Sequence, residues 1–272
     1  VYDSASPQHP LLDPFRNMWN KRGLIGLLVA RDLTLRYKRS VLGVWWTILN
    51  PLLTTLIYWL VFQNIFGRQG EDGVPFVVYL LSGTLFVSTF FSQGVLACGT
   101  SLMGGRNILS KVRVPGEVFA VTASVAAAVN FAIGLVILAG IQLLQGPGIP
   151  WTIVLVPIPL LAMLMFVTGV GMLIASAAIH FYDVIDFVRV LLQLAVWMVP
   201  TFYPLDIIPD SLLPFIKINP LFSYLRVFRG FMYEGTFAPT WNFAYMGVSA
   251  VVALLLGVWV FSRSWRQAAV KM

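Results

Sequence analysis

The chain has 272 residues, of which 58% are hydrophobic and 11% are charged, and its formal net charge is +7. Soluble domains carry roughly 25% charged residues, so this composition excludes an ordinary soluble domain and favours a protein embedded in lipid. A nucleic-acid partner is disfavoured as well, because the basic residues border apolar runs, as expected for membrane topology.

Long runs of the chain contain no Asp, Glu, Lys or Arg, and they are 40–67, 73–105, 118–182, 190–205 and 235–262. A bilayer-spanning helix needs about 20 apolar residues, so each run supplies one span except the longest, which is long enough for two. The turn signal Gln145-Gly146-Pro147-Gly148 divides that run. We therefore predict an all-α integral membrane protein with six transmembrane helices, near 44–66, 75–97, 118–144, 150–179, 184–203 and 242–262.

The fifth predicted span differs from the others because Asp186 and Arg189 occupy its first turns. The two residues are three positions apart on one helix face, so we expect them to pair. The other five spans contain no charged residue, whereas proton-coupled carriers usually keep ionisable groups at mid-membrane. The sequence thus disfavours a proton-coupled carrier.

Basic residues set the expected orientation. With six spans both termini share one side of the membrane, and most of the 18 basic residues lie in segments on that side. The positive-inside rule therefore places both termini in the cytoplasm. We expect residues 1–43 to form a cytoplasmic N-terminal arm, 44–262 to form the transmembrane domain and 263–272 to form a cytoplasmic tail.

A mixed basic and apolar segment, residues 15–40, precedes the first span. Such a segment is typical of an amphipathic helix that lies along the inner leaflet, with its cations near the lipid phosphates. The sequence leaves open whether this interface helix only anchors the first span or also takes part in gating. Its candidate residues are Arg31, Arg36, Tyr37, Lys38 and Arg39.

The loop between the second and third predicted spans, residues 107–117, is the next informative segment. It carries basic residues and ends in a Pro115-Gly116 break, and Glu117 then lies where a negative charge stabilises a helix N-terminus. Composition alone favours an ordinary positive-inside loop with a helix stop. The spacing of the loop residues is similar to that of a known family's docking loop, and this resemblance favours a docking site for a partner. The candidate docking residues that it implies are Asn107, Leu109, Lys111, Val112, Arg113, Pro115 and Glu117.

Aromatic residues make up 14% of the chain and permit two interpretations. Trp and Tyr often form belts at the ends of membrane helices, which suits Trp45, Trp46, Trp197 and Tyr203. Aromatic rings with a polar group also offer flat surfaces to sugars, so rings further from the interfaces are candidates for lining a pore. These pore candidates are Tyr58, Trp59, Tyr79, Phe86 and Phe90.

Residues 199–230, between the fifth and sixth predicted spans, combine several prolines with two short apolar stretches. Proline interrupts helices, so this segment predicts broken helices that dip back into the outer leaflet rather than another span. Arg226 and Arg229 are expected here either as anchors to lipid phosphates or as groups that attract a pyrophosphate headgroup.

Three motifs together resemble one family. They are the junction Tyr37-Lys38-x-Ser40-x-Leu42-Gly43-x-x-Trp46-x-x-x-x-Pro51-Leu52, the loop pattern Asn-x-x-x-Lys-Val-x-x-Pro-x-Glu at 107–117, and the Pro-x-Phe-Tyr-Pro, Asn-Pro-Leu and terminal Arg motifs at 200–229. They resemble the permease subunits of ABC-2-type polysaccharide exporters (Wzm-like permeases), which move O-antigen, teichoic-acid, capsule and galactan-type glycans. Two departures occur, since Tyr182-Asp183 replaces the usual Arg-Asp pair and Arg226 stands where many relatives have an acidic residue.

The resemblance implies a coupling helix in the loop 107–117 and re-entrant helices near an outer gate, whose candidate residues are Phe202, Tyr203, Asn219, Arg226 and Arg229. It also implies a homodimer in the bacterial plasma (inner) membrane, bound to two cytoplasmic ABC ATPase subunits (Wzt-like). The implied cargo is an undecaprenyl-pyrophosphate-linked polysaccharide. The chain itself has no Gly-x-x-x-x-Gly-Lys-Ser/Thr loop, so we expect no enzyme activity and no cofactor, with ATP and Mg bound by the partner.

Three alternatives stay open. An ABC-2 exporter of drugs or small lipids shares the same architecture. A self-sufficient channel or ion-coupled carrier would work without an ATPase, and a sodium site built from hydroxyls and carbonyls is compatible with the sequence. A membrane enzyme or a metal site is disfavoured, because His9 and His180 lie far apart and no cluster of His, Cys or carboxylates occurs.

Overall fold

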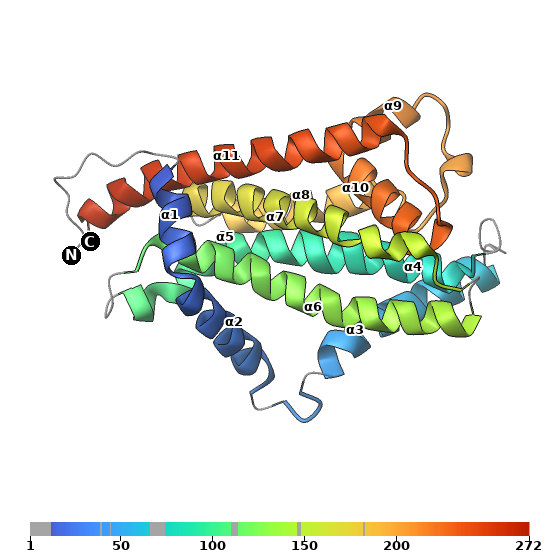
Figure 1. Ribbon diagram of the computed structural model, residues 1–272, viewed down its shortest axis with the longest axis horizontal. Helices are drawn as coiled ribbons and strands as arrows, with labels where there is room; N and C mark the ends of the chain where they lie inside the picture. The colour runs from blue at the N-terminus through green and yellow to red at the C-terminus, as the bar shows by residue number, and fades with distance from the viewer. Residues whose placement is uncertain are drawn as a thin grey trace.

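The computed structural model describes residues 12–38, 40–43, 45–65, 74–109, 114–145, 148–181 and 183–271. Within these ranges the chain is a bundle of helices without a strand, and its long helices run side by side along the longest axis of the molecule (Figure 1). The all-α architecture predicted from the sequence is therefore confirmed.

Five helical segments in the described part are long and apolar enough to cross a membrane. They are Trp45–Gln63, Phe76–Gly104, Gly116–Gln145, Trp151–Ala178 and Thr240–Trp265. Each of them overlaps one predicted span, so the first four predicted spans and the sixth correspond to helices in the structure.

The first two segments are built from several consecutive elements. α3 (Trp45–Trp59) continues into the π-helical η1 (Leu60–Ile65). The second segment consists of α4 (Phe76–Gly83), the π-helical η2 (Thr84–Ser92) and α5 (Gln93–Leu109). A π-helix makes i→i+5 hydrogen bonds and is rare beyond a single turn. Because η2 is π-helical, the side chains of α5 point in different directions relative to α4 than they would along one continuous α-helix.

The remaining long helices enclose the second segment. α6 (Gly116–Gln145) is followed by the short 3₁₀ turn η3 (Trp151–Leu155) and by α7 (Pro157–Ala178). Pro157 occupies the first helical position of α7, where its missing N–H removes no intrahelical hydrogen bond. α7 packs against α5 on one side and against α11 (Thr240–Lys271) on the other.

The fifth predicted span, 184–203, differs most from its prediction. α8 (Val184–Trp197) has 14 residues. At 1.5 Å per residue it is about 21 Å long, less than the ~30 Å hydrocarbon layer. Beyond it, the carbonyl of Pro200 accepts a hydrogen bond from the hydroxyl of Tyr79 near the start of α4 (2.9 Å). From the end of α7 the chain thus reaches the far end of the bundle. The count of six full membrane spans stays a prediction.

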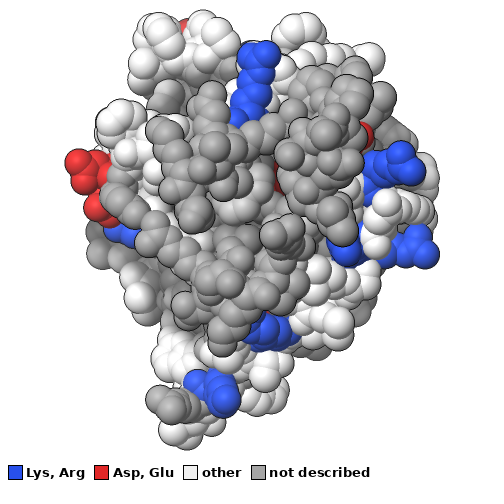
Figure 2. Space-filling view, turned by 90° about the vertical axis from the view of Figure 1, so that its left-hand side faces the viewer, with Lys and Arg blue, Asp and Glu red and all other residues white. Residues whose placement is uncertain are grey.

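The N-terminal helices α1 (Leu12–Asn20) and α2 (Arg22–Tyr37) begin at the same end of the bundle at which α11 ends (Figure 1). Figure 2 shows this end, with Lys and Arg side chains spread around the rim of the face. Asp186 and Arg189 of α8 form an ion pair of 2.7 Å, as predicted from their spacing. Most of the described basic residues therefore lie at the end that carries the termini, and the placement of this end in the cytoplasm stays a prediction.

Short helices at the opposite end connect α8 to α11, and they are η4 (Leu205–Ile207), α9 (Leu213–Ile218), α10 (Pro220–Arg229) and the π-helical η5 (Gly230–Glu234). Asn219 caps α10, because its Oδ1 accepts a hydrogen bond from the backbone N–H of Leu221 (3.1 Å). Pro220 then starts the helix at a position where proline is favoured. The prediction of broken helices in this segment is confirmed.

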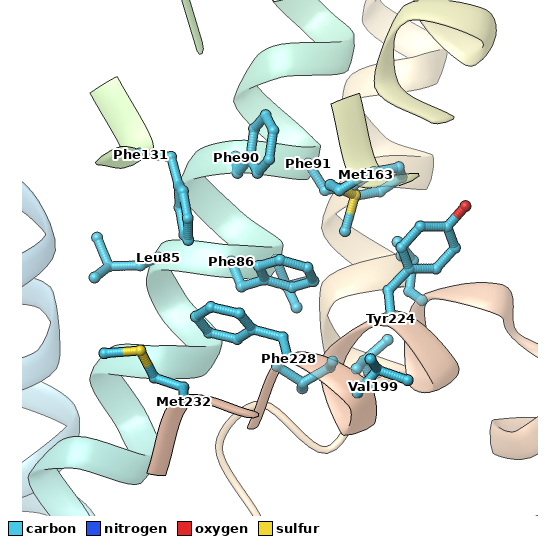
Figure 3. Packing of buried hydrophobic residues seen from close by; sticks show 14 of the residues in the cluster. Leu85, Phe86, Phe90, Phe91, Phe131, Met163, Val199, Tyr224, Phe228 and Met232 are labelled. Carbon is cyan, nitrogen blue, oxygen red and sulfur yellow. The ribbon is translucent and has the colours of Figure 1, made fainter. Parts of the chain in front are cut away.

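The core of the bundle is aromatic. Phe86 of η2 stacks on Phe228 of α10 with ring centroids 4.4 Å apart. Phe131 of α6 meets the edge of Phe86 at 5.8 Å and stacks on Phe90 at 5.1 Å (Figure 3). Each such ring pair contributes about 0.5–1.5 kcal/mol to the free energy of folding, in addition to the contribution from burial of the rings. The core therefore joins the second and third spans directly to the short helix α10.

Candidate functional site

Part of the predicted coupling segment falls outside what the structure describes. The structure does not describe Lys111, Val112 and Arg113, nor the side chains of Asn107 and Leu109. The backbone of α5 ends at Leu109 and α6 begins at Gly116. The predicted loop therefore joins two helices that pack against each other.

The described end of the coupling segment, residues 115–117, packs against the end of α11. Pro115 precedes α6, and Glu117 is buried in the first turn of that helix, where its charge is favoured. A Cβ added to Gly116 would lie 2.8 Å from the indole ring of Trp265. Because the two helices touch so closely here, a movement of the segment would also displace the end of α11.

The segment predicted as an interface helix forms α1 and α2, while its position along the inner leaflet stays a prediction. Leu28 and Val29 are buried against the bundle, while Leu27 is 71% exposed. The exposed Leu27 suits contact with lipid. Of the candidate residues, Arg31 and Lys38 are exposed, whereas the side chains of Arg36 and Tyr37 and all of Arg39 fall outside the described structure.

The candidate pore aromatics lie within the protomer in this conformation. Phe86 and Phe90 are at most 1% exposed, and Tyr79 is buried beside them in the same cluster. Tyr58 and Trp59 are partly buried and pack against that cluster. Lining a pathway would require these rings to separate from neighbours in their own chain, and that role stays a prediction.

Arg229, at the end of α10, has an environment that sequence reasoning did not anticipate. Its side chain is only 5% exposed, although it was expected either to anchor lipid phosphates or to attract a pyrophosphate headgroup. α4, the turn 199–203 and α10 itself surround it. Since a lipid headgroup has no access to a side chain enclosed in this way, the predicted anchoring role is wrong for Arg229.

The guanidinium of Arg229 uses its donors on backbone carbonyls and one hydroxyl. Nη1 donates to the carbonyl of Pro200 (2.8 Å), and Nη2 donates to the carbonyls of Tyr79 (3.0 Å) and Thr201 (3.4 Å). Nε donates to Oγ of Ser82 (3.2 Å). The Cζ atom also lies 3.7 Å from the ring centroid of Tyr79, a cation–π contact. The cation is thus compensated by dipoles and a ring that are held in place around it.

Tyr79, like Arg229, forms hydrogen bonds to the turn 199–203. Its hydroxyl donates to the carbonyls of Pro200 (2.9 Å) and Tyr203 (2.8 Å). The ring of Phe202 lies between Tyr58 and Trp197, with centroid distances of 4.5 and 5.0 Å. Two predicted outer-gate residues, Phe202 and Tyr203, are therefore held together with Arg229 in one cluster, which we call the Arg229 cluster.

Arg226 is the contrasting arginine of α10. Its Nη1 lies 3.7 Å from Oε1 of Glu234, and both side chains are partly exposed. An exposed pair of this kind contributes about 0–1 kcal/mol. Sequence reasoning missed Glu234 and Ser82 as partners of the two arginines. A hydroxyl such as Ser82 in an apolar span was the available signal, because polar side chains in spans need partners.

The comparisons with known proteins agree with this architecture. The ABC-2 type transporter family matches residues 23–233. The O-antigen export system permease protein RfbA of Myxococcus xanthus is 31% identical over 223 residues, which are 80% of this chain and 84% of the relative. RfbA of Klebsiella pneumoniae is 24% identical over 245 residues (88% and 91%). The capsule polysaccharide export inner-membrane protein CtrC of Neisseria meningitidis is 27% identical over 251 residues (89% and 91%).

The matched region extends from the interface helix α2 to the π-helical η5. It therefore includes four of the five long apolar segments and the whole Arg229 cluster, so the similarity covers the architecture rather than one isolated motif. On this basis the chain is a member of the ABC-2 type transporter family, the membrane-spanning permeases of ABC transporters.

Proposed function

We propose that the chain is the permease subunit of an ATP-driven exporter of polysaccharide. The observation that carries this proposal is the near full-length similarity to permeases named for O-antigen and capsule export, which reaches 31% identity. The cargo we propose is a polysaccharide linked to undecaprenyl pyrophosphate. A drug or small-lipid exporter would share the fold, and no described feature favours it over the glycan.

The charge distribution supports a subunit that depends on a partner for energy. Among the five long apolar segments, the only charged residues are Glu117 and Arg263, and both lie near the end of the bundle that carries the termini. A proton-coupled carrier would need an ionisable group further inside the membrane. We therefore propose that a separate ABC ATPase (Wzt-like) supplies the energy and binds ATP and Mg.

The proposed assembly is a homodimer with two ATPase subunits in the bacterial plasma membrane, with both termini of each permease in the cytoplasm. Apolar side chains on the outer faces of α3 and α8 support it, because they offer surface for lipid or a second copy. The exposed examples are Leu53, Leu56, Ile57, Phe187, Leu191 and Leu194. In this arrangement ATP-driven closure of the partners would push on the loop 107–117 and on α2, and the resulting movement would open the pathway.

Reconstitution tests the proposed function directly. Vesicles that contain the permease and its ATPase should accumulate lipid-linked polysaccharide when ATP is added on the ATPase side, and vesicles with the permease alone should not. Accumulation against a gradient by the permease alone would instead establish an ion-coupled carrier. Transport of drugs or small lipids without transport of polysaccharide would establish the other exporter class.

The coupling loop offers a second test. Reversal of its charge by Lys111→Glu or Arg113→Glu should weaken association with the ATPase by about tenfold or more, because like charges placed together at an interface cost several kcal/mol. Co-purification of the two subunits and ATP-dependent export should fall together. Arg16→Glu, on the exposed surface of α1, is the matched control. Normal assembly and export in the loop variants would remove the loop as the docking point.

A further inference from the structure

Two neighbouring cavities are lined by residues of α2, α3, α5, α6 and η2. In Figure 1, α2 and α3 lie on the same side of α6. Their volumes are about 240 and 300 Å³. Ala97 of α5 lines both, and on α6 the lining passes from Ala126 in one to Ala127 in the other. The two cavities are therefore adjacent, and we call the pair, which lies between α2, α3, α5 and α6, the lateral groove.

The lateral groove extends along α6 from Phe119 to Asn130. At 1.5 Å per residue this is roughly 16 Å. The two volumes together fall within the ~300–1,000 Å³ that is usual for ligand sites. Arg31 and Asp32 lie at the end near the chain termini, and the lining beyond them is uncharged.

The uncharged lining is unusually polar for a groove between apolar helices. Amides and hydroxyls line it from three helices and from η2, and they are Thr47, Asn50, Thr89, Gln93, Thr100, Ser101, Thr122 and Asn130. Away from the groove the same helices expose apolar side chains such as Ile57 of α3 and Val136 of α6. Because polar groups are costly in a membrane span, this concentration on one groove calls for a polar occupant.

Several of these groups have hydrogen-bonding capacity to spare. Oγ1 of Thr122 is buried, with the residue 2% exposed, and it has no partner in the described part of the chain. The amides of Asn50 and Gln93 make no hydrogen bond among the described residues. Thr100 differs, because its hydroxyl donates to the carbonyl of Leu96 in its own helix (2.9 Å). The spare groups therefore point to a ligand rather than to internal packing.

The chemistry of the lining selects the ligand. Each amide offers a donor and an acceptor side by side, a pattern that fits neighbouring hydroxyls on a sugar ring. Trp46 lines the same cavity as the amides, and its indole provides an apolar face for the C–H side of such a ring. An acyl chain would not satisfy the amides, and a phosphate would need cations, which the uncharged part of the groove lacks.

We propose that the lateral groove is a binding site for hydroxyl-rich sugar units of the transported polysaccharide, reached from between α2 and α3. The proposal rests on the proposed function, and it adds a place for the glycan in a single protomer. That place is formed by amides and hydroxyls with one indole and does not involve the buried rings of Phe86 and Phe90. Movement of α2 would open or close the groove, because Leu28 and Arg31 of α2 line it.

Cysteine labelling of the complete transporter in lipid nanodiscs tests this proposal. Gln93→Cys should react with a charged, membrane-impermeant methanethiosulfonate, because a thiol reacts as the thiolate and therefore needs water. Lipid-linked polysaccharide should slow that reaction about tenfold or more. Val136→Cys on α6 is the matched control, since Val136 is 73% exposed away from the groove and should not react in either condition. The native Cys98 is fully buried and should stay unlabelled.

A second variant separates binding from folding. Thr122→Val keeps the shape of the side chain and removes a hydroxyl without a described partner, so the stability should not fall. The KM for polysaccharide should rise about fivefold, because one hydrogen bond to the sugar is lost. An unchanged KM, or a cysteine at position 93 that polysaccharide does not protect, overturns the proposal. Failure of the proposed function is distinct, because the unmodified transporter would then export no polysaccharide.

Discussion

Replacing Arg229 by Ala should lower the free energy of unfolding by about 3–5 kcal/mol, because buried acceptors lose their hydrogen bonds to a charged donor. The guanidinium donates to the carbonyls of Tyr79, Pro200 and Thr201 and to Oγ of Ser82. Without it, the carbonyl of Thr201 and Oγ of Ser82 lose the donor that the structure shows for them. The carbonyls of Pro200 and Tyr79 keep one donor each, the hydroxyls of Tyr79 and Ser82. Each unsatisfied acceptor costs about 1–3 kcal/mol before the structure relaxes.

Arg229→Lys should recover only part of this loss. Lysine retains the positive charge, but its three donors on one nitrogen cannot match acceptors that are arranged around a planar fork. It also loses the stacking of the guanidinium on the ring of Tyr79, where Cζ lies 3.7 Å from the centroid. We expect a stability between those of the wild type and Arg229→Ala.

Arg226→Ala is the matched control, because the same residue type on the same helix is removed from an exposed position. Its pair with Glu234 spans 3.7 Å at the surface, so we expect a loss of about 0–1 kcal/mol. Equilibrium unfolding of the purified permease in detergent micelles, followed by circular dichroism, measures both variants. Equal losses for the two arginines would show that the buried cluster does not stabilise the protein.

The Arg229 cluster also predicts which parts of the outer end move together. Arg229 and Tyr79 both bind the carbonyl of Pro200, so the turn 199–203, α4 and α10 are fastened to one another. Phe228, next to Arg229, stacks on Phe86 and extends this connection into the core. If the outer end opens during transport, we expect these elements to move as one unit.

The sequence was sufficient for the features that depend on local composition. Charge-free runs identified the five long helical segments, because the cost of charge in lipid applies to each residue separately. The turn signal at 145–148 correctly divided the longest run, and α6 ends at Gln145. The Asn219-Pro220 pair marked the start of α10, where the two residues cap and begin the helix.

The setting of Arg229 could not be predicted in the same way. Its partners on α4 lie 147 and 150 positions away in the chain, and nothing in the local sequence indicates that these segments meet. Topology rules treat an arginine at a helix end as exposed, which is correct for Arg226 and incorrect for Arg229. The distinction depends on which face of α10 packs inward, and that is a tertiary property.

Two further differences have backbone causes. The uncharged run 190–205 suggested a helix to residue 203, but α8 ends at Trp197. Pro200 has no N–H and restricts the residue before it, so this proline was the signal for an earlier end. The orientation of Phe86 and Phe90 was hidden because η2 is π-helical, and its turns do not follow the 3.6-residue period.

Gly257→Ala should produce the second large loss, because α7 and α11 touch through their backbones at this point. A Cβ added to Gly257 would overlap the backbone of Gly169, and a Cβ on Gly169 would overlap the backbone of Ala253. Backbone atoms cannot rotate aside as a flexible side chain can, so the helices must separate. Small residues at helix contacts are the usual means of close approach in membranes. We expect a loss of about 1–3 kcal/mol, typical of overpacking.

Gly247→Ala on the same helix is the control, since nothing lies within 4 Å of the added Cβ. Alanine is favoured over glycine inside a helix by about 1 kcal/mol, so this variant should be neutral or more stable. The midpoint of thermal unfolding in detergent should therefore fall for Gly257→Ala and not for Gly247→Ala. A common response of the two variants would mean that α7 and α11 pack loosely enough to accept a methyl group at their contact.

The glycine contact also connects stability to coupling. Trp265 lies eight residues beyond Gly257 on α11, about 12 Å along the helix, and its ring packs on Gly116 at the start of α6. If the added methyl group tilts α11 away from α7, the indole should lift from Gly116 and loosen the end of the coupling segment. Gly257→Ala should then lower ATP-dependent export more than it lowers the amount of folded transporter. Export that falls only in proportion to folded protein would confine the effect to stability.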